Sequence, residues 1–141
     1  MKLFFPNLED LRRGFWVKGH WDHDMCSLLL GRSPLAGDHW YFAPQAKLDC
    51  VCGHHVESTA HFLFDCPLWL NYRHILSVDE LWPLDKKCRV VGRNLGKLRD
   101  FIKATGRFDS KNVVCKQIKE RFKPFFKAKL RRRVNYDRLL T

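Results

Sequence analysis

The segment from Cys50 to Pro67, CVCGHHVESTAHFLFDCP, constrains the fold more than any other part of the chain. Two thiols one residue apart are followed by His61 and, five positions later, by Cys66. Three cysteines and a histidine are the four ligands that tetrahedral Zn²⁺ takes in closed structural sites. The spacing therefore predicts one structural Zn²⁺ on Cys50, Cys52, His61 and Cys66.

Local backbone signals support a ligand site of this shape. Gly53 follows the second thiol, where a tight turn favours a positive φ. Ser58 is a predicted N-cap for a short helix that carries His61 in its first turn. Cys66 ends that helix, because the residue before Pro67 is pushed out of the α region.

Alternative roles remain open for several of these side chains. The cysteines could be buried free thiols and His61 a core histidine, since free cysteine is among the most buried residue types. His54 and His55 are expected to be exposed turn residues, and either could replace His61 as a ligand. Three further cysteines lie far from the cluster and are predicted to be packing residues: Cys26, Cys88 and Cys115.

The zinc segment resembles the Cys-Cys-His-Cys region C-terminal to the reverse transcriptase of LINE-type (non-LTR) retrotransposons. The residues that carry the resemblance are Cys50, Cys52, Gly53, Glu57, Ser58, His61, Leu63, Phe64, Cys66, Pro67 and Arg73. A weaker similarity covers Gly19-His20 and the stretch Phe101 to Arg107, although Lys18 stands where that family usually has threonine. The resemblance implies an accessory module that holds template RNA or target DNA beside a polymerase.

Positive charge is concentrated at the C-terminal end. Residues 1–110 hold 15 Lys and Arg against 13 Asp and Glu, a net charge of +2, whereas residues 111–141 hold 11 against 2, a net charge of +9. Such a block favours binding to nucleic acid, RNA or DNA, mainly through phosphates. The predicted contact residues are Lys127, Lys129, Arg131, Arg132 and Arg133. The alternative is a solvated helix face, which is common for runs of charge.

The same region carries an apolar residue at every fourth position. The stripe consists of Val114, Ile118, Phe122, Phe126, Leu130 and Val134. This period predicts an amphipathic helix, and Pro124 should kink or divide it. The stripe is expected to pack on the body or in a partner's groove rather than to stack on bases.

The remaining patterns are helical. Asn7 can cap a helix through Leu8, Leu11 and Phe15, and Asp22 or Asp24 can open one that ends at Gly31. Residues 33–47 read as a loop whose rings, Trp40, Tyr41 and Phe42, should fold back onto the core. A helix from Pro67 to Leu76 should bury Leu68, Trp69, Tyr72 and Ile75, and another should run from about Val90 to Thr105, using Leu95, Leu98, Phe101 and Ile102, before Gly106.

These features predict a mainly α chain, with a helical zinc-binding domain at 1–108 and a basic amphipathic helix at 109–141. The aromatic-x-Asp-Asp pattern of reverse transcriptases is absent, and the acidic and histidine cluster at 20–24 matches no hydrolytic metal site, so catalysis is not expected. No apolar run of membrane-span length and no signal-peptide pattern occurs, which favours an intracellular protein, nuclear or cytoplasmic, with no membrane partner.

Three functional hypotheses follow. The first is a non-catalytic nucleic-acid-binding module, a fragment or degenerate copy of a polyprotein whose polymerase portion would be a second partner. The parent polyprotein could then be an RNA-directed DNA polymerase. The second is a host-adopted adaptor in which zinc organises a protein-binding surface, and the third is a metal-dependent nuclease.

Overall fold

The computed structural model describes Phe4, residues 22–40, Ala43 and residues 46–140, with side chains described as far as Phe126 in the last helix. The elements in this part of the chain are all helical, in the order α2 (His23–Leu29), η2 (Ala36–His39), η3 (His61–Asp65), η4 (Pro67–Leu76), α3 (Leu84–Arg93), α4 (Leu95–Thr105) and α5 (Val113–Leu140). The predicted mainly α fold is confirmed to that extent. The predicted helix beginning at Asn7 lies outside the described residues.

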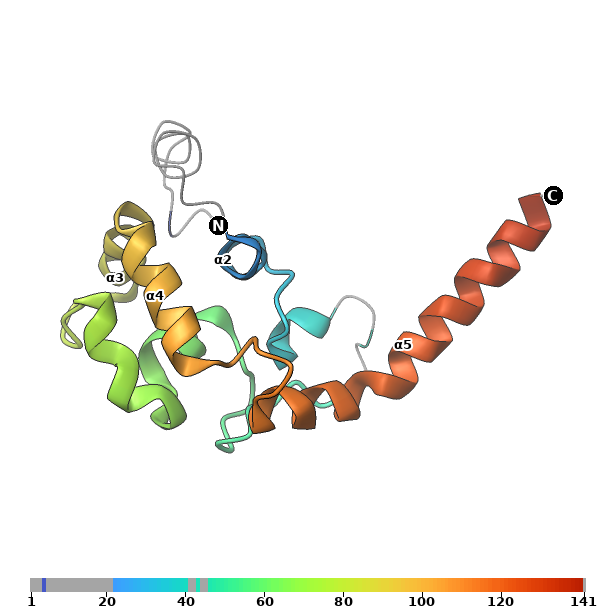
Figure 1. Ribbon diagram of the computed structural model, residues 1–141, viewed down its shortest axis with the longest axis horizontal. Coiled ribbons are helices and arrows are strands. Elements are labelled where there is room, and N and C mark those ends of the chain that lie inside the picture. Colours follow the sequence, from blue (N-terminus) through green and yellow to red (C-terminus); the bar gives the residue numbers. More distant parts are fainter. Residues whose placement is uncertain (1–3, 5–21, 41–42, 44–45, 141) are drawn as a thin grey trace.

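Helix α4 is the centre of the body. It packs against η4, α2 and α3, and η3 packs against η4 (Figure 1). The face of α4 that was predicted from the apolar period, Leu95, Leu98, Phe101 and Ile102, is buried. Phe101 and Phe62 bring their ring centroids within 5.3 Å, which joins α4 to the segment that carries the metal-ligand candidates. Gly106 ends α4 with a φ of 64°, as predicted.

Helix α2 begins as the sequence indicates. Asp22 accepts hydrogen bonds from the backbone N–H groups of Asp24 and Met25 at 3.0 and 3.4 Å, so its carboxylate is an N-cap. This role accounts for Asp22, one of the two acidic residues in the 20–24 cluster. His20 lies outside the described residues.

The predicted helix from about Val90 to Thr105 is wrong in its extent. Two helices occupy this region, α3 and α4, and they are separated at Asn94, whose φ of −126° and ψ of 58° are not helical. Helix α3 starts earlier than predicted, directly after Pro83. The apolar period of α4 does not reveal this break. Asn94 is polar and exposed, as a residue on the outer face of one continuous helix would be.

The boundaries of the predicted 67–76 helix are confirmed, but its buried face is partly wrong. Trp69 and Leu76 are buried, whereas Leu68 and Tyr72 are exposed. The element is a 3₁₀ helix with non-helical angles at Trp69, rather than an α-helix. A 3₁₀ helix has about three residues per turn instead of the 3.6 of an α-helix. Its side chains, and those after the kink at Trp69, therefore point in directions that the α-helical period does not predict.

The prediction that Trp40 folds onto the core is also wrong, since its side chain is 63% exposed. The preceding residue, His39, takes the buried position, with its ring stacked on Phe122 at a centroid distance of 4.2 Å. Tyr41 and Phe42, which were predicted with Trp40, lie outside the described residues.

The first half of α5 packs on the body. Asn112 caps the helix by accepting from the N–H groups of Val114 and Cys115. Ile118 and Phe122 are buried against Ala36 and Ala43, so this part of the stripe packs internally, as predicted. Pro124 lies within one continuous helix, and Figure 1 shows α5 changing direction part-way along its length, which is a kink rather than a division.

None of the described helices combines the length and the apolar character that a membrane span requires.

Candidate metal centre

A tight turn presents the first two cysteines. The N–H of Gly53 donates to the carbonyl of Cys50 at 3.0 Å, and the N–H of Cys50 donates to the carbonyl of His54 at 2.9 Å. Gly53 has a φ of 100°, which confirms the predicted left-handed position. The turn therefore holds the two thiols next to each other on a short, closed piece of backbone.

A wide helical turn presents the other two ligand candidates. Ser58 accepts a hydrogen bond from the N–H of His61 at 3.2 Å, which confirms its predicted capping role. The N–H of Cys66 then donates to the carbonyl of His61 at 2.7 Å, a bond that spans five residues. In an α-helix, residues five apart point about 140° away from each other, so this wider π turn lets both side chains face one centre. Cys66 leaves the helical region, with φ −67° and ψ 121°, before Pro67.

The four predicted ligands come together. The ligand atoms of Cys50, Cys52, His61 and Cys66 all lie within 4.8 Å of one another. Cys50 Sγ is 3.8 Å from Cys66 Sγ, and Cys52 Sγ is 3.3 Å from His61 Nε2. Tetrahedral coordination with Zn–S of about 2.3 Å and Zn–N of about 2.0–2.1 Å would separate two sulfurs by about 3.8 Å, and a sulfur from a nitrogen by about 3.6 Å. The cluster can therefore hold a metal ion without large rearrangement.

Burial sets the protonation of the ligands. Desolvation raises the pKa of the Cys50 and Cys66 thiols, because the charged thiolate is disfavoured away from water. Desolvation, helped by nearby His54, lowers the pKa of His61, which keeps the imidazole neutral. Neutral imidazole is the ligand form, whereas the thiols must lose protons to a bound metal.

His54 supports the site without joining the cluster. Its ring stacks on that of His61 at a centroid distance of 4.2 Å and an angle of 15°. Its Nδ1 lies 2.9 Å from the backbone carbonyl of Val56. His54 and His55 are both exposed, as predicted, and within the described residues the cluster of ligand atoms includes neither. His61 Nδ1 is buried and has no hydrogen-bond partner among the described residues.

A buried ion pair behind the site was missed from the sequence. Arg107 donates to Glu57 through Nη2 to Oε1 at 2.6 Å and through Nε to Oε2 at 3.0 Å. The backbone N–H of Ala36 adds a third hydrogen bond to Oε1 at 2.7 Å. Glu57 and Arg107 are 1% and 0% exposed, and Glu57 Oε2 lies 3.9 Å from Cys50 Sγ. The pair therefore connects the metal segment to the end of α4 and to η2.

Two other arginines fix the backbone next to the ligands. Arg73 donates to the carbonyls of Cys66 and Leu63, at 2.5 and 3.1 Å, and so holds the last turn of the ligand helix. Arg121 of α5 donates to the carbonyls of Asp49 and Lys47, at 2.6 and 3.2 Å. Arg73 belongs to the motif that carries the family resemblance, whereas Arg121 reaches the segment from more than 70 residues away.

The other predicted site residues are the five basic residues of the C-terminal helix. The backbone of α5 includes Lys127, Lys129, Arg131, Arg132 and Arg133, but their side chains lie outside the described residues. Cys26, Cys88 and Cys115 are free and buried, as expected of packing residues. Burial raises the pKa of Cys88 to about 11, which favours the neutral thiol at physiological pH.

No protein-family model matches the chain, and the searches of curated proteins and of solved structures gave no match either.

Proposed function

We propose that this chain is a non-catalytic nucleic-acid-binding module whose body is organised by a structural Zn²⁺ on Cys50, Cys52, His61 and Cys66. The observation that carries the proposal is the convergence of these four ligand atoms within 4.8 Å. Three thiolates and one imidazole in tetrahedral reach are the donor set of structural zinc, rather than of Mg²⁺ or Ca²⁺, which take oxygen ligands. Four protein ligands leave no coordination position for water or substrate, and this favours a structural role.

The charge of the C-terminal helix supports the nucleic-acid role. Residues 111–141 carry a net charge of +9, and Ile118 and Phe122 anchor the start of α5 on the body. Figure 1 shows the C-terminal half of α5 running away from the other helices, which leaves its surroundings accessible to a long polyanion. The resemblance of the zinc segment to the region after LINE-type reverse transcriptases supports the same role beside a polymerase, with this chain as a fragment or degenerate copy.

Replacement of Arg131, Arg132 and Arg133 by alanine should weaken nucleic-acid binding almost equally for all sequences. Phosphate contacts release counterions, so log affinity falls with log salt at about −0.9 per contacted phosphate on duplex DNA and about −0.7 on single strands. Four or five contacts give a slope of roughly −3 to −5, and the triple variant should flatten it by about two to three. Fluorescence anisotropy between 50 and 300 mM salt measures both slopes.

The control is Lys86→Ala with Lys87→Ala and Arg89→Ala, which removes three cations from α3. This variant should leave the slope unchanged. An unaltered slope in the Arg131–Arg133 variant, with its melting temperature intact, would contradict the nucleic-acid role. It would favour the adaptor hypothesis, in which zinc organises a surface for another protein.

The isolated chain should show neither polymerase nor nuclease turnover. Phosphoryl transfer with two metals needs grouped carboxylates, and in the described part of the chain the only group of potential metal ligands is the Cys and His cluster. Primer extension and cleavage of labelled RNA and DNA, each with Mg²⁺ and Mn²⁺, test this expectation. Turnover that co-purifies with the protein and disappears in Asp24→Asn would show instead that the 20–24 cluster is catalytic. Asp24 is preferred to Asp22 for this test because Asp22 caps α2.

A further inference from the structure

Three thiolates give the proposed metal centre an excess of negative charge. One Zn²⁺ does not neutralise three thiolates, and the neutral imidazole adds no charge. Cys50 and Cys66 are 2% and 0% exposed, so water does little to stabilise this charge. The Glu57–Arg107 pair near Cys50 is neutral as a whole and does not offset it. A further cation close to the ligands should therefore favour the bound metal.

The carbonyl of Leu63, within the ligand turn, needs a donor from another segment. In an α-helix it would accept from the N–H of residue 67, but Pro67 has no N–H. In a π turn the donor would be residue 68. Burial raises the pKa of the Cys66 thiol, and the Leu68 N–H partly offsets this rise by interacting with the thiol. Because an unpaired buried carbonyl is costly, the turn depends on a donor from outside it.

Arg73 of η4 supplies this donor. Its Nε donates to the carbonyl of Leu63 at 3.1 Å, and its Nη2 donates to the carbonyl of Cys66 at 2.5 Å. Both acceptors lie toward the C-terminal end of the ligand turn, where free carbonyls carry partial negative charge. The planar guanidinium therefore fixes the backbone from which the Cys66 side chain extends toward the other ligands.

Arg73 also brings a permanent positive charge to the metal ligands. Burial lowers the pKa of this group, and Cys66, followed by Asp65 and Glu80, acts in the opposite direction. A guanidinium stays protonated in proteins. Within the part of the chain that the structure describes, no carboxylate forms an ion pair with Arg73, so its charge is not committed to a salt bridge.

We propose that Arg73 is a positioning residue of the metal centre, which retains Zn²⁺ by fixing the carbonyls of Leu63 and Cys66 and by placing a positive charge near the Cys66 thiolate. Residues that orient metal ligands from outside the coordination sphere typically contribute about 10- to 100-fold to metal affinity. The inference rests on the proposed structural zinc and adds a residue that determines how tightly the metal is held.

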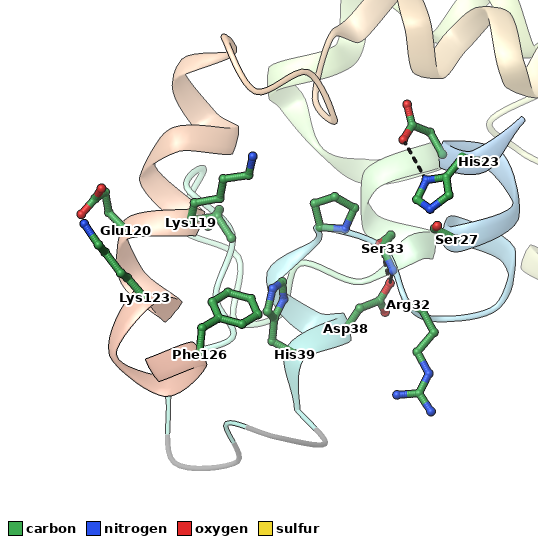
Figure 2. A pocket seen from close by; sticks show the side chains of 13 residues that line it. His23, Ser27, Arg32, Ser33, Asp38, His39, Lys119, Glu120, Lys123 and Phe126 are labelled. Atoms are coloured by element: carbon green, nitrogen blue, oxygen red, sulfur yellow. Dashed lines mark hydrogen bonds and ion pairs between the residues drawn. The ribbon is translucent and has the colours of Figure 1, made fainter. Parts of the chain in front are cut away.

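Arg73→Gln should weaken zinc binding by about 10- to 100-fold, measured by competition with a chromophoric chelator. Arg73→Lys keeps the charge but lacks the planar fork that reaches two carbonyls, so it should lose less. Arg89→Gln makes the same change at an exposed arginine of α3 and is the matched control. Lys119→Gln removes a cation from the wall of a cavity of about 490 Å³ between α2 and α5, which no metal ligand lines (Figure 2). Both controls should bind zinc as tightly as the wild type.

Substitution of Co²⁺ for Zn²⁺ separates this role from general support of the fold. The visible absorption of Co²⁺ depends on the identity and geometry of its ligands, so Arg73→Gln should alter the spectrum because Cys66 is no longer fixed. Arg89→Gln and Lys119→Gln should keep the wild-type spectrum. If Arg73→Gln does not fold, Arg73→Lys is compared with the wild type and should bind zinc more weakly.

Wild-type zinc affinity or a wild-type Co²⁺ spectrum in Arg73→Gln would overturn the inference, as would an equal loss of affinity in Arg73→Gln and Arg73→Lys. The proposed zinc site would still stand in these cases if the wild-type protein held one zinc per chain. A wild-type protein that binds no zinc would remove the proposed site and this inference together.

Discussion

Cys52→Ser should lower the melting temperature by about 10 °C or more and reduce the bound zinc to well under one ion per chain. Zinc binding supplies folding free energy, of about 10–16 kcal/mol in small zinc-finger peptides, and a domain of this size gains only about 5–15 kcal/mol of net stability. The serine keeps the shape of the side chain but removes the thiolate ligand. The loss should extend through the body, because the cluster joins the 50–53 turn to the helix that carries Phe62 and Leu63 of the core.

The matched control is Cys26→Ser, which makes the same chemical change at a buried cysteine outside the cluster. This variant should keep one zinc per chain and should lose stability only modestly. Addition of a chelator should bring the wild-type protein down to about the melting temperature of Cys52→Ser and lower that of Cys26→Ser by a similar amount, while Cys52→Ser itself should not respond. A wild-type protein that melts at the same temperature with and without chelator, or that contains far less than one zinc, would show that the four ligands do not hold a structural metal.

The candidate metal centre could be predicted from the sequence because its determinants are local. Gly53, Ser58 and Pro67 each act on the backbone within a few residues of a ligand, and all three behave as their residue types require. The wide turn between His61 and Cys66 follows from the same constraint, since a five-residue spacing brings both side chains to one centre only if the helix expands. Backbone effects that act within a few residues can be predicted from a single sequence.

The features that were missed depend on contacts between distant segments. Nothing near Glu57 indicates that its partner is Arg107, 50 residues away, and Glu57 in isolation reads as a charge near a helix start. The exposure of Trp40 depends on His39 taking the place against Phe122 of α5. The apolar period and the helix propensities of a sequence predict which face of a helix is buried, but they do not predict which other segment covers that face.

The basic helix α5 has one feature that the sequence predicts and one that the sequence does not. Its apolar period predicted internal packing for Ile118 and Phe122, and this is confirmed. The same stripe includes Phe126, which lies at the edge of a cavity rather than in the core. Ile118 and Phe122 pack against Ala36 and Ala43, whereas Phe126, one turn further along α5, is 41% exposed.

Arg107→Ala should destabilise the fold by about 3–5 kcal/mol. Removing one partner of a buried ion pair leaves the other charge without compensation in a medium of low polarity. In this chain the Glu57 carboxylate would keep only the N–H of Ala36 as a close hydrogen-bond donor among the described contacts, and it would lie 3.9 Å from Cys50 Sγ. Two negative groups would then face each other when the thiolate binds metal, so the variant should also bind zinc more weakly. Urea unfolding and competition with a zinc chelator measure the two effects.

The matched control is Arg89→Ala, which removes the arginine of the exposed pair with Asp85 on α3. Exposed pairs contribute about 0–1 kcal/mol, so this variant should stay close to the wild type in both measurements. The double variant Glu57→Gln with Arg107→Met removes both charges together, and it should recover much of the stability and of the zinc affinity that Arg107→Ala loses. If Arg107→Ala were no more harmful than Arg89→Ala, the pair would not hold the metal segment to α4. If the double variant were less stable than Arg107→Ala alone, the loss would come from packing around the guanidinium rather than from an unpaired carboxylate.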